Sequence, residues 1–113
     1  MTIEEFIVDY LSGVLSDPVS GDVPSPVLPR FVTVEKTGGR RENKISSATV
    51  AVQSWAESRA DAADLCAAVE AAMEALVEEP EISHCSLDAS YNFPDLSRKK
   101  PRYQAVFSIV HYL

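Results

Sequence analysis

The apolar positions follow two different repeats in one continuous stretch of the chain. In Ser47–Trp55, apolar residues alternate with polar or small ones, which predicts a β-strand with one buried face. In Arg59–Glu79, apolar residues recur every three or four positions, which predicts an amphipathic helix about 30 Å long. Ser58 is placed to cap the start of this helix, and Pro80 cannot continue it.

Further elements flank this strand and helix. A capping-box pattern followed by helical spacing predicts a first helix at about residues 3–15, and a proline-rich loop comes after it. Alternation predicts a first strand at Arg30–Lys36 and later strands at Ile82–Tyr91 and Arg102–Leu113. Between the first two strands, the pair Gly38-Gly39 predicts a turn with positive φ angles, so we expect a hairpin with a long basic tip.

The last two predicted strands differ in how much of their surface is apolar. In Ile82–Tyr91 one face is polar, which is typical of a strand near a sheet edge. The other face would carry Cys85, Leu87, Ala89 and Tyr91. Arg102–Leu113 is apolar on both faces, so we expect it to be a central strand with something covering each face.

These elements predict an α+β fold in the order α-β-β-α-β-β, as a single domain spanning residues 1–113. Placing the last strand between the second and third gives a four-stranded, mostly antiparallel sheet of order 1-2-4-3 with both helices on one face; order 1-2-3-4 is the alternative. The other face would be too apolar for a solitary monomer, so we expect a partner against it. It would present Phe31, Thr33, Thr49, Trp55, Val106, Val110 and Tyr112.

The net charge of −7 is unevenly spread. Residues 1–29 and 45–81 carry thirteen acids and one base, whereas residues 30–44 and 82–113 carry nine bases and four acids. Helical stretches are therefore acidic and candidate loops basic, which indicates either solvated surfaces or charge complementarity between copies of the chain. The overall sign argues against broad nucleic-acid binding. No apolar run is long enough to span a membrane, and the N-terminus lacks a signal-peptide pattern.

The residue types that usually carry catalysis form no recognisable motif. Cys66 and Cys85 both fall on apolar faces and are expected to be buried thiols of a reducing compartment, with a disulfide between them as the alternative. A zinc site of these cysteines with His84 is disfavoured, since adjacent strand residues point to opposite faces. No nucleophile motif is present. We therefore expect a protein that is not an enzyme and that has no cofactor.

Candidate contact residues fall into three groups. Basic side chains at the two loop tips could meet acidic helices of a neighbouring copy or DNA phosphates, although solvated tips are the simpler interpretation. Trp55, at the junction of strand and helix, could anchor an interface or plug the end of the core. The last strand contributes its second apolar face. The full set is Arg40, Arg41, Trp55, Lys99, Lys100, Val106, Val110 and Tyr112.

The layout of nearly the whole chain resembles the tail-terminator, or tail-completion, proteins of long-tailed bacteriophages. A short first helix and a loop precede "LPRFVTVEKTGG", a strand that ends in a glycine turn. "ATVAVQSWAESRADAADLCAAVEAAMEAL" is a strand that ends in Trp-Ala before an alanine-rich helix, and the chain closes with "RYQAVFSIVHYL". These motifs are structural rather than catalytic, and the segment "SRKKPR" and the proline-rich loop have no counterpart in the match.

The resemblance implies a structural protein of the virion that forms a hexameric ring. Such a ring caps the tail tube at the head–tail junction and presents a surface to the head connector or stopper protein. The implied partners are other copies of the chain, the tail-tube protein and the connector, with DNA only as the genome passing through the channel and assembly in the bacterial cytoplasm. Two alternatives stay open: another head–tail joining protein of the neck, or a bacterial ligand-binding or regulatory α+β module that dimerises.

Overall fold

Two helices and five strands make up the computed structural model, which describes all 113 residues. The α+β class is therefore as predicted, but the sheet has one strand more than the four expected. In chain order the elements are α1 (Ile3–Val14), β1 (Val19–Ser20), β2 (Phe31–Glu42), β3 (Ile45–Trp55), α2 (Arg59–Glu74), a 3₁₀ turn η1 (Leu76–Glu78), β4 (Ile82–Asn92) and β5 (Arg102–His111).

The strands form one open sheet of order β1-β2-β3-β5-β4. The four long strands are antiparallel and keep the relative order predicted for them, with β5 in the interior of the sheet. The missed strand, β1, lies in the proline-rich loop and pairs in parallel with Val32 and Thr33. Two residues between prolines and glycine carry no alternation that a sequence pattern could detect.

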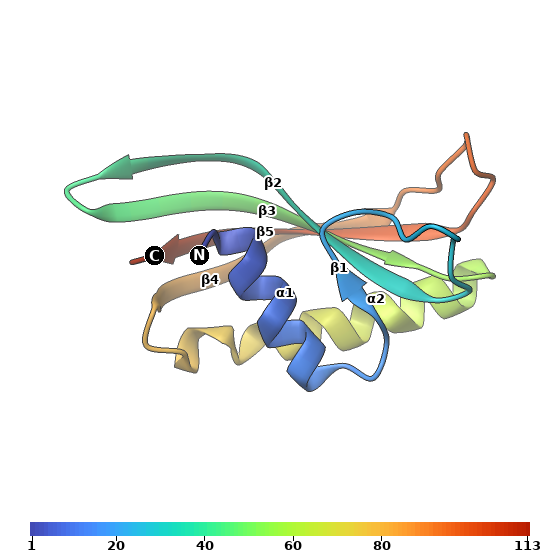
Figure 1. Ribbon diagram of the computed structural model, residues 1–113, viewed down its shortest axis with the longest axis horizontal. Coiled ribbons are helices and arrows are strands. Elements are labelled where there is room, and N and C mark those ends of the chain that lie inside the picture. The colour runs from blue at the N-terminus through green and yellow to red at the C-terminus, as the bar shows by residue number, and fades with distance from the viewer.

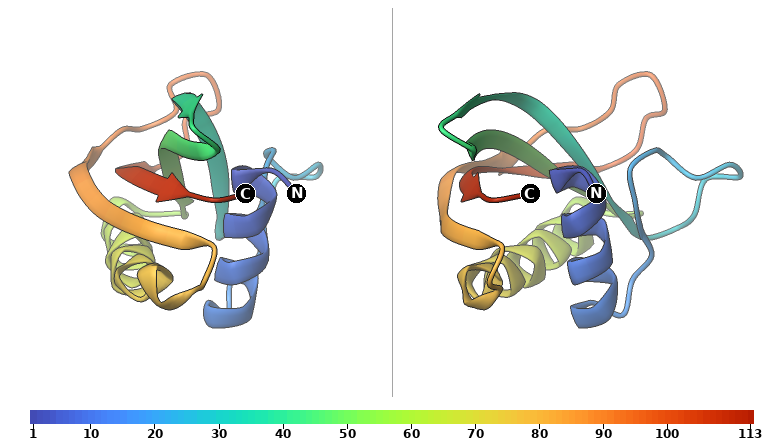
Figure 2. Two further views of the ribbon diagram at one scale, coloured as in Figure 1. Left: turned by 90° about the vertical axis from the view of Figure 1, so that its left-hand side faces the viewer. Right: turned by 60° about the vertical axis from the view of Figure 1, so that its left-hand side comes forward.

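Both helices cover the same face of the sheet (Figures 1 and 2), as the sequence predicts. They close a single core against the inward side chains of β2, β3 and β5. A reciprocal capping box of Thr2 and Glu5 starts α1, and Ser58 caps α2. The helical contribution to the core is Ile3, Ile7, Leu11, Ala62, Leu65, Cys66, Val69, Ala72 and Met73.

The hairpin between β2 and β3 is much longer than predicted. The chain reverses at Asn43 and Lys44, whose φ angles of 51° and 66° suit a tight hairpin turn. Neither Gly38 nor Gly39 has a positive φ, so the expectation that they form the turn is wrong. Gly39 is needed for space instead, because a Cβ there would lie 2.6 Å from the backbone oxygen of Ser47.

The outer part of this hairpin, residues 37–49, forms a projecting ribbon that we call the arm (Figure 1). A register shift at Thr37 separates it from the regular part of β2, and such bulges bend and twist a strand. The arm contributes to a molecule that is 43 Å long but only 25 Å across. A two-stranded ribbon is marginal alone, and β5 supports this one by pairing with β3 as far as Ser46.

A second register shift, between Leu87 and Ala89, corrects the predicted faces of β4. Leu87 pairs with Phe107 of the core, whereas Ala89 pairs with Val106 on the opposite face. The predicted apolar face of Cys85, Leu87, Ala89 and Tyr91 is therefore split between the two sides of the sheet. The bulge adds a residue to one strand, so strict alternation fails beyond it. The edge position predicted for this strand is correct.

Candidate interaction surfaces

The sheet face opposite the helices, here called the outer face, is covered over only part of its area. Phe31, Thr33 and Trp55 are buried there within the single chain, which corrects the prediction of a wholly uncovered apolar face. Figure 1 shows the two long loops, residues 21–30 and 93–101, lying at the same end of the molecule. The aromatic side chains expected to need a partner are therefore already satisfied at this end.

Trp55 fills the covered part of the outer face instead of anchoring an interface. Its side chain is 1% exposed and stacks on Phe31 with ring centroids 5.2 Å apart. The guanidinium of Arg102 lies 4.8 Å from the Trp55 ring centroid and 4.4 Å from that of Phe93, in cation–π geometry. Arg102 also donates from Nε to the Phe93 carbonyl at 2.7 Å. Trp55 is therefore buried within the single chain, but on the outer face and not at the end of the core that the helices close.

A chain of hydrogen bonds crosses the outer face from Trp55 toward β4. The indole Nε1 donates to Thr33 Oγ1 at 3.0 Å, and that hydroxyl donates to Gln53 Oε1 at 2.7 Å. Gln53 Nε2 donates to Gln104 Oε1 at 2.8 Å, and Gln104 Nε2 donates to the Tyr91 hydroxyl at 2.6 Å. Buried amides and hydroxyls need such partners. This network could not be predicted from the sequence, because it depends on the register of four strands.

The β4–β5 loop is ordered by hydrogen bonds and an ion pair within it. Asp95 accepts hydrogen bonds from the backbone N–H groups of Ser97 and Arg98 and forms an ion pair of 2.7 Å with the Arg98 guanidinium. The bonds from Arg98 are the main cause of the lowered pKa of Asp95. Lys99 is exposed with a φ of 53°, and Lys100 Nζ donates to the Pro29 carbonyl at 3.3 Å. Lys99 is therefore accessible at the tip of the loop, whereas the side chain of Lys100 is held by its hydrogen bond to Pro29.

The open half of the outer face is small and mixed in polarity. Val106 and Val110 are half-buried in β5, flanked by Ser108. Tyr112 follows β5 and is 56% exposed, with its backbone N–H bonded to the Glu81 carbonyl. Arg40, Arg41 and the valines meet no common pocket with Lys99 or Lys100. The eight predicted contact residues therefore do not form one site; they lie on the arm, the loop hairpin and the sheet face.

The basic side chains of the arm are solvent-exposed. Arg40 has one ion pair, with Glu42 at 3.7 Å, and both side chains are largely exposed. Such a surface pair contributes well under about 1 kcal/mol. Arg41 has no ion pair. These charges add little to the stability of the single chain, so they are free to act on another molecule.

Both long edges of the sheet have unpaired backbone. On the β2 side, β1 pairs only with Val32 and Thr33, and the Glu4 carboxylate accepts the Lys36 N–H at 3.0 Å. Beyond that point, the β2 strand of the arm has no strand on its outer side. On the other side, β4 pairs with β5 alone along Ile82–Asn92. Exposed strand edges are templates for pairing with another chain.

The two cysteines and the two histidines do not lie together in one cluster. Cys66 is buried and Cys85 half-buried, both are free, and both face the helix layer. Burial raises the pKa of the Cys85 thiol to about 11, with a smaller contribution from Asp88. His84 pairs with Val110 and lies on the outer face, away from the cysteines. No cluster of three His, Cys, Asp or Glu side chains is placed to hold a metal.

Two further findings bear on assignment. Neither helix combines the length and the apolar composition that a membrane-spanning segment requires. No protein-family model matches the chain, and a search of curated proteins finds no significant match.

Proposed function

We propose that this chain is a ring-forming structural subunit of the tail-terminator kind. In this role, six copies close into a ring at the head–tail junction of a phage, cap the tail tube and offer a surface to the connector or stopper protein. The observation that carries the proposal is the pair of unpaired edges, on β4 and on the arm of β2. A chain with two different open edges can join head to tail, and such contacts close into rings when the rotation permits.

The strand directions favour this contact. Each of the three steps from β2 to β3, β5 and β4 is antiparallel, so β4 runs opposite to β2. When neighbouring subunits share one orientation, the β4 edge of one copy meets the β2 edge of the next in antiparallel fashion. Antiparallel edges pair with straight hydrogen bonds and need no change within the subunit.

The segments at and next to the two edges carry opposite charges. Residues 36–44, in and next to the arm, carry four bases and one acid, a sum of +3. Residues 74–88, from the end of α2 into β4, carry five acids and no base, a sum of −5. Opposite charges on the two contact surfaces steer association and fix its register, and like edges repel each other. This favours a head-to-tail contact over a symmetric pairing of two arms.

A dimer packed face to face has less support. Phe31 and Trp55 of the outer face are covered within the chain, whereas Tyr91 and Tyr112 stay 41% and 56% exposed. Next to the arm, the open half is lined mainly by small residues such as Ser47, Thr49 and Ser108. The apolar area that a stable dimer would need is therefore reduced. The expectation of a partner against this face, which applies to a ring as well as to a dimer, is weakened to the same degree.

The proposal is tested by the oligomeric state and its salt dependence. We expect sedimentation velocity to show a concentration-dependent monomer–hexamer equilibrium that shifts toward monomer between about 50 mM and 500 mM salt, because screening weakens complementary edges. Negative-stain electron microscopy of the large species should show rings. A monomer at every concentration, or a dimer that ignores salt, would refute the proposed assembly.

A matched pair of variants isolates the arm. Lys44 and Lys99 are both exposed lysines with positive φ, one at the tip of the arm and one at the tip of the β4–β5 loop. Lys44→Glu should weaken assembly about tenfold or more, while Lys99→Glu, with the same change of charge, should not. Equal effects would assign association to overall charge and not to the arm.

A further inference from the structure

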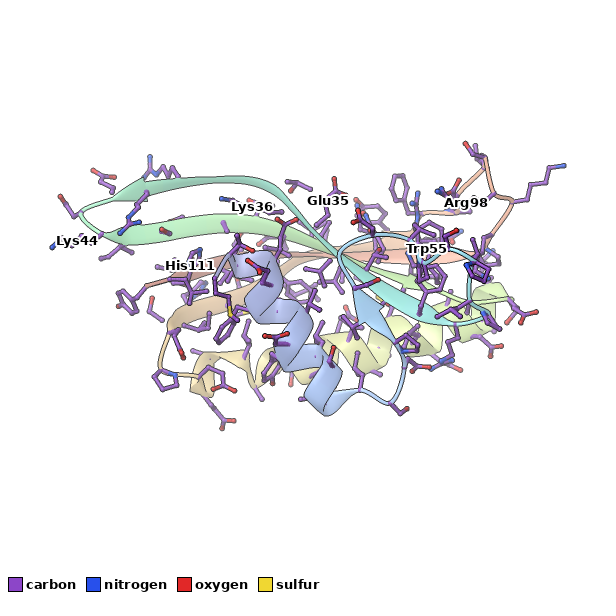
Figure 3. All side chains as sticks on the ribbon, viewed as in Figure 1. Glu35, Lys36, Lys44, Trp55, Arg98 and His111 are labelled. Atoms are coloured by element: carbon purple, nitrogen blue, oxygen red, sulfur yellow. The ribbon has the colours of Figure 1, made fainter.

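A hollow of about 410 Å³ lies where the arm, the start of α1 and the end of β5 meet. The two chain ends lie side by side here in Figures 1 and 2, and Figure 3 shows Lys36 and His111 at this end of the molecule. Its lining is rich in basic and polar groups and has a single acidic side chain. The lining residues are Met1, Thr2, Ile3, Glu4, Lys36, Gly39, Arg40, Arg41, Ser46, His111 and Leu113.

His111 lines this hollow and carries a buried nitrogen without a partner. Its side chain is 5% exposed, and Nδ1 accepts a hydrogen bond from the Leu113 N–H at 3.3 Å. In a neutral imidazole that bond leaves the proton on Nε2. Nε2 is buried and has no acceptor. An orphan N–H of this kind calls for an oxygen atom.

Two of the cations around His111, Lys36 and Arg41, lack acidic partners. No carboxylate lies within 4.0 Å of the charged nitrogens of Lys36 or Arg41. Glu4, on α1, is engaged by the Lys36 backbone N–H. Burial, and then the charges of Lys36 and Arg41, lower the pKa of His111, which indicates a positive potential at the ring.

The backbone makes room for this arrangement. The Lys36 side chain lies across Gly39, with Cε 2.8 Å from the place where a Cβ would be. Any larger residue at position 39 would displace the lysine or strike the Ser47 carbonyl. The absence of a side chain at position 39 therefore leaves room for Lys36 to lie against the arm.

We propose that this hollow is a binding site for a tetrahedral oxyanion of the phosphate type, held by Lys36, Arg41 and His111. Arg41 comes from the arm, Lys36 from the residue of β2 just before it, and the neutral donor from the end of β5, so the three donors come from different segments. That spread suits an anion with several oxygens better than a planar carboxylate. Lys36 and Arg41 are exposed, so their long side chains can turn toward the anion. Nε2 of His111 is buried, so it reaches the anion only when the groups around it move. The proposal does not require ring formation, although Lys36 and Arg41 also belong to the basic segment, residues 36–44, that we propose for the contact between subunits.

The chain contains only two histidines, which makes the test direct. His84 is exposed on the outer face and serves as an internal reference. Imidazole resonances are followed by NMR while inorganic phosphate is added at constant ionic strength. We expect a saturable shift of the His111 resonances and a rise of its pKa toward the usual range, because a bound anion favours the imidazolium. His84 should not respond, and acetate should act far more weakly.

Variants separate the site from general charge. Lys36→Met and Arg41→Gln should each weaken the phosphate response roughly tenfold, since each removes a charge-assisted donor. Lys44→Gln removes the same charge from the arm outside the hollow and should leave the response unchanged. Absence of a saturable shift, an equal shift at His84, or equal weakening by Lys44→Gln would overturn the proposal and leave the Nε2 proton to an ordinary water molecule.

Discussion

Replacing Trp55 with phenylalanine tests whether this residue belongs to the interior of the single chain or to an interface. The change keeps an aromatic ring against Phe31 but removes the Nε1 donor that bonds Thr33. It also leaves part of a site that is 1% exposed unfilled. Loss of the hydrogen bond costs about 1 kcal/mol, and the smaller ring adds about 1–2 kcal/mol. We therefore expect the free energy of unfolding to fall by about 2–3 kcal/mol.

A double-mutant cycle assigns part of that loss to the bond itself. Thr33→Val leaves the indole N–H buried without an acceptor, which costs about 1–3 kcal/mol, but in a Trp55→Phe background that group no longer exists. The two changes should therefore be coupled by about 1 kcal/mol or more. Urea unfolding followed by far-ultraviolet circular dichroism gives all four values without relying on indole fluorescence.

Two results would contradict the role in the interior of the chain that we assign to Trp55. Additivity within about 0.3–0.5 kcal/mol would show that the Trp55–Thr33 bond does not contribute to folding. A Trp55→Phe protein of unchanged stability that no longer self-associates would show that the residue acts at an interface after all. Sedimentation at matched concentrations, run beside the unfolding curves, distinguishes these outcomes.

Three further predictions concern single positions. Gly39→Ala should lower the free energy of unfolding by about 1–3 kcal/mol because its Cβ meets the Ser47 carbonyl, while Gly38→Ala, in open space, should not; thermal unfolding compares the two. The pKa of His111 is lowered in the folded state, so stability should fall as pH drops below about 6.5, where the unfolded chain takes up the proton first; His111→Asn should flatten that part of the profile in urea titrations. The Cys85 thiol, with its pKa raised to about 11, should react with a disulfide reagent far more slowly than a free thiol at pH 8, and faster only on unfolding.

The sequence predicts the fold best where burial decides the residue type. β5 is apolar on both faces, and the structure places it between β3 and β4, so the relative order of the four long strands follows from that one pattern. The periodic apolar positions of α2 likewise predict its buried face, including Leu65, Val69 and Met73. In each case the signal is the free-energy cost of exposing apolar surface, which sequence records directly.

The prediction of the fold from the sequence fails where backbone hydrogen bonds alone determine the length or register of a strand. The arm extends β2 by six residues beyond Lys36, through side chains that are mostly exposed. Its strands pair through main-chain groups that every residue carries, so polar residues leave no periodic trace. The bulge after Leu87 moves the following residues of β4 to the opposite faces of the sheet. It too depends on backbone pairing, which leaves no pattern in the sequence. The sequence predicts the face of the sheet on which Trp55 lies. It does not predict that Arg102 and the β4–β5 loop, whose composition suggests a solvated segment, bury this side chain.

These failures coincide with the parts of the molecule that assembly would use. An exposed ribbon stabilises its own fold little, yet the arm keeps a defined turn at Asn43 and Lys44 and a glycine at position 39 that close packing requires. Its charges have almost no partners within the chain. A segment whose defined structure the core does not require is expected where contacts with a second molecule supply the missing stabilisation. The arm is therefore the segment in which variants should separate assembly from folding most cleanly: Lys44→Glu should change association while the urea midpoint stays within error, and a loss of both together would show that the arm serves the fold.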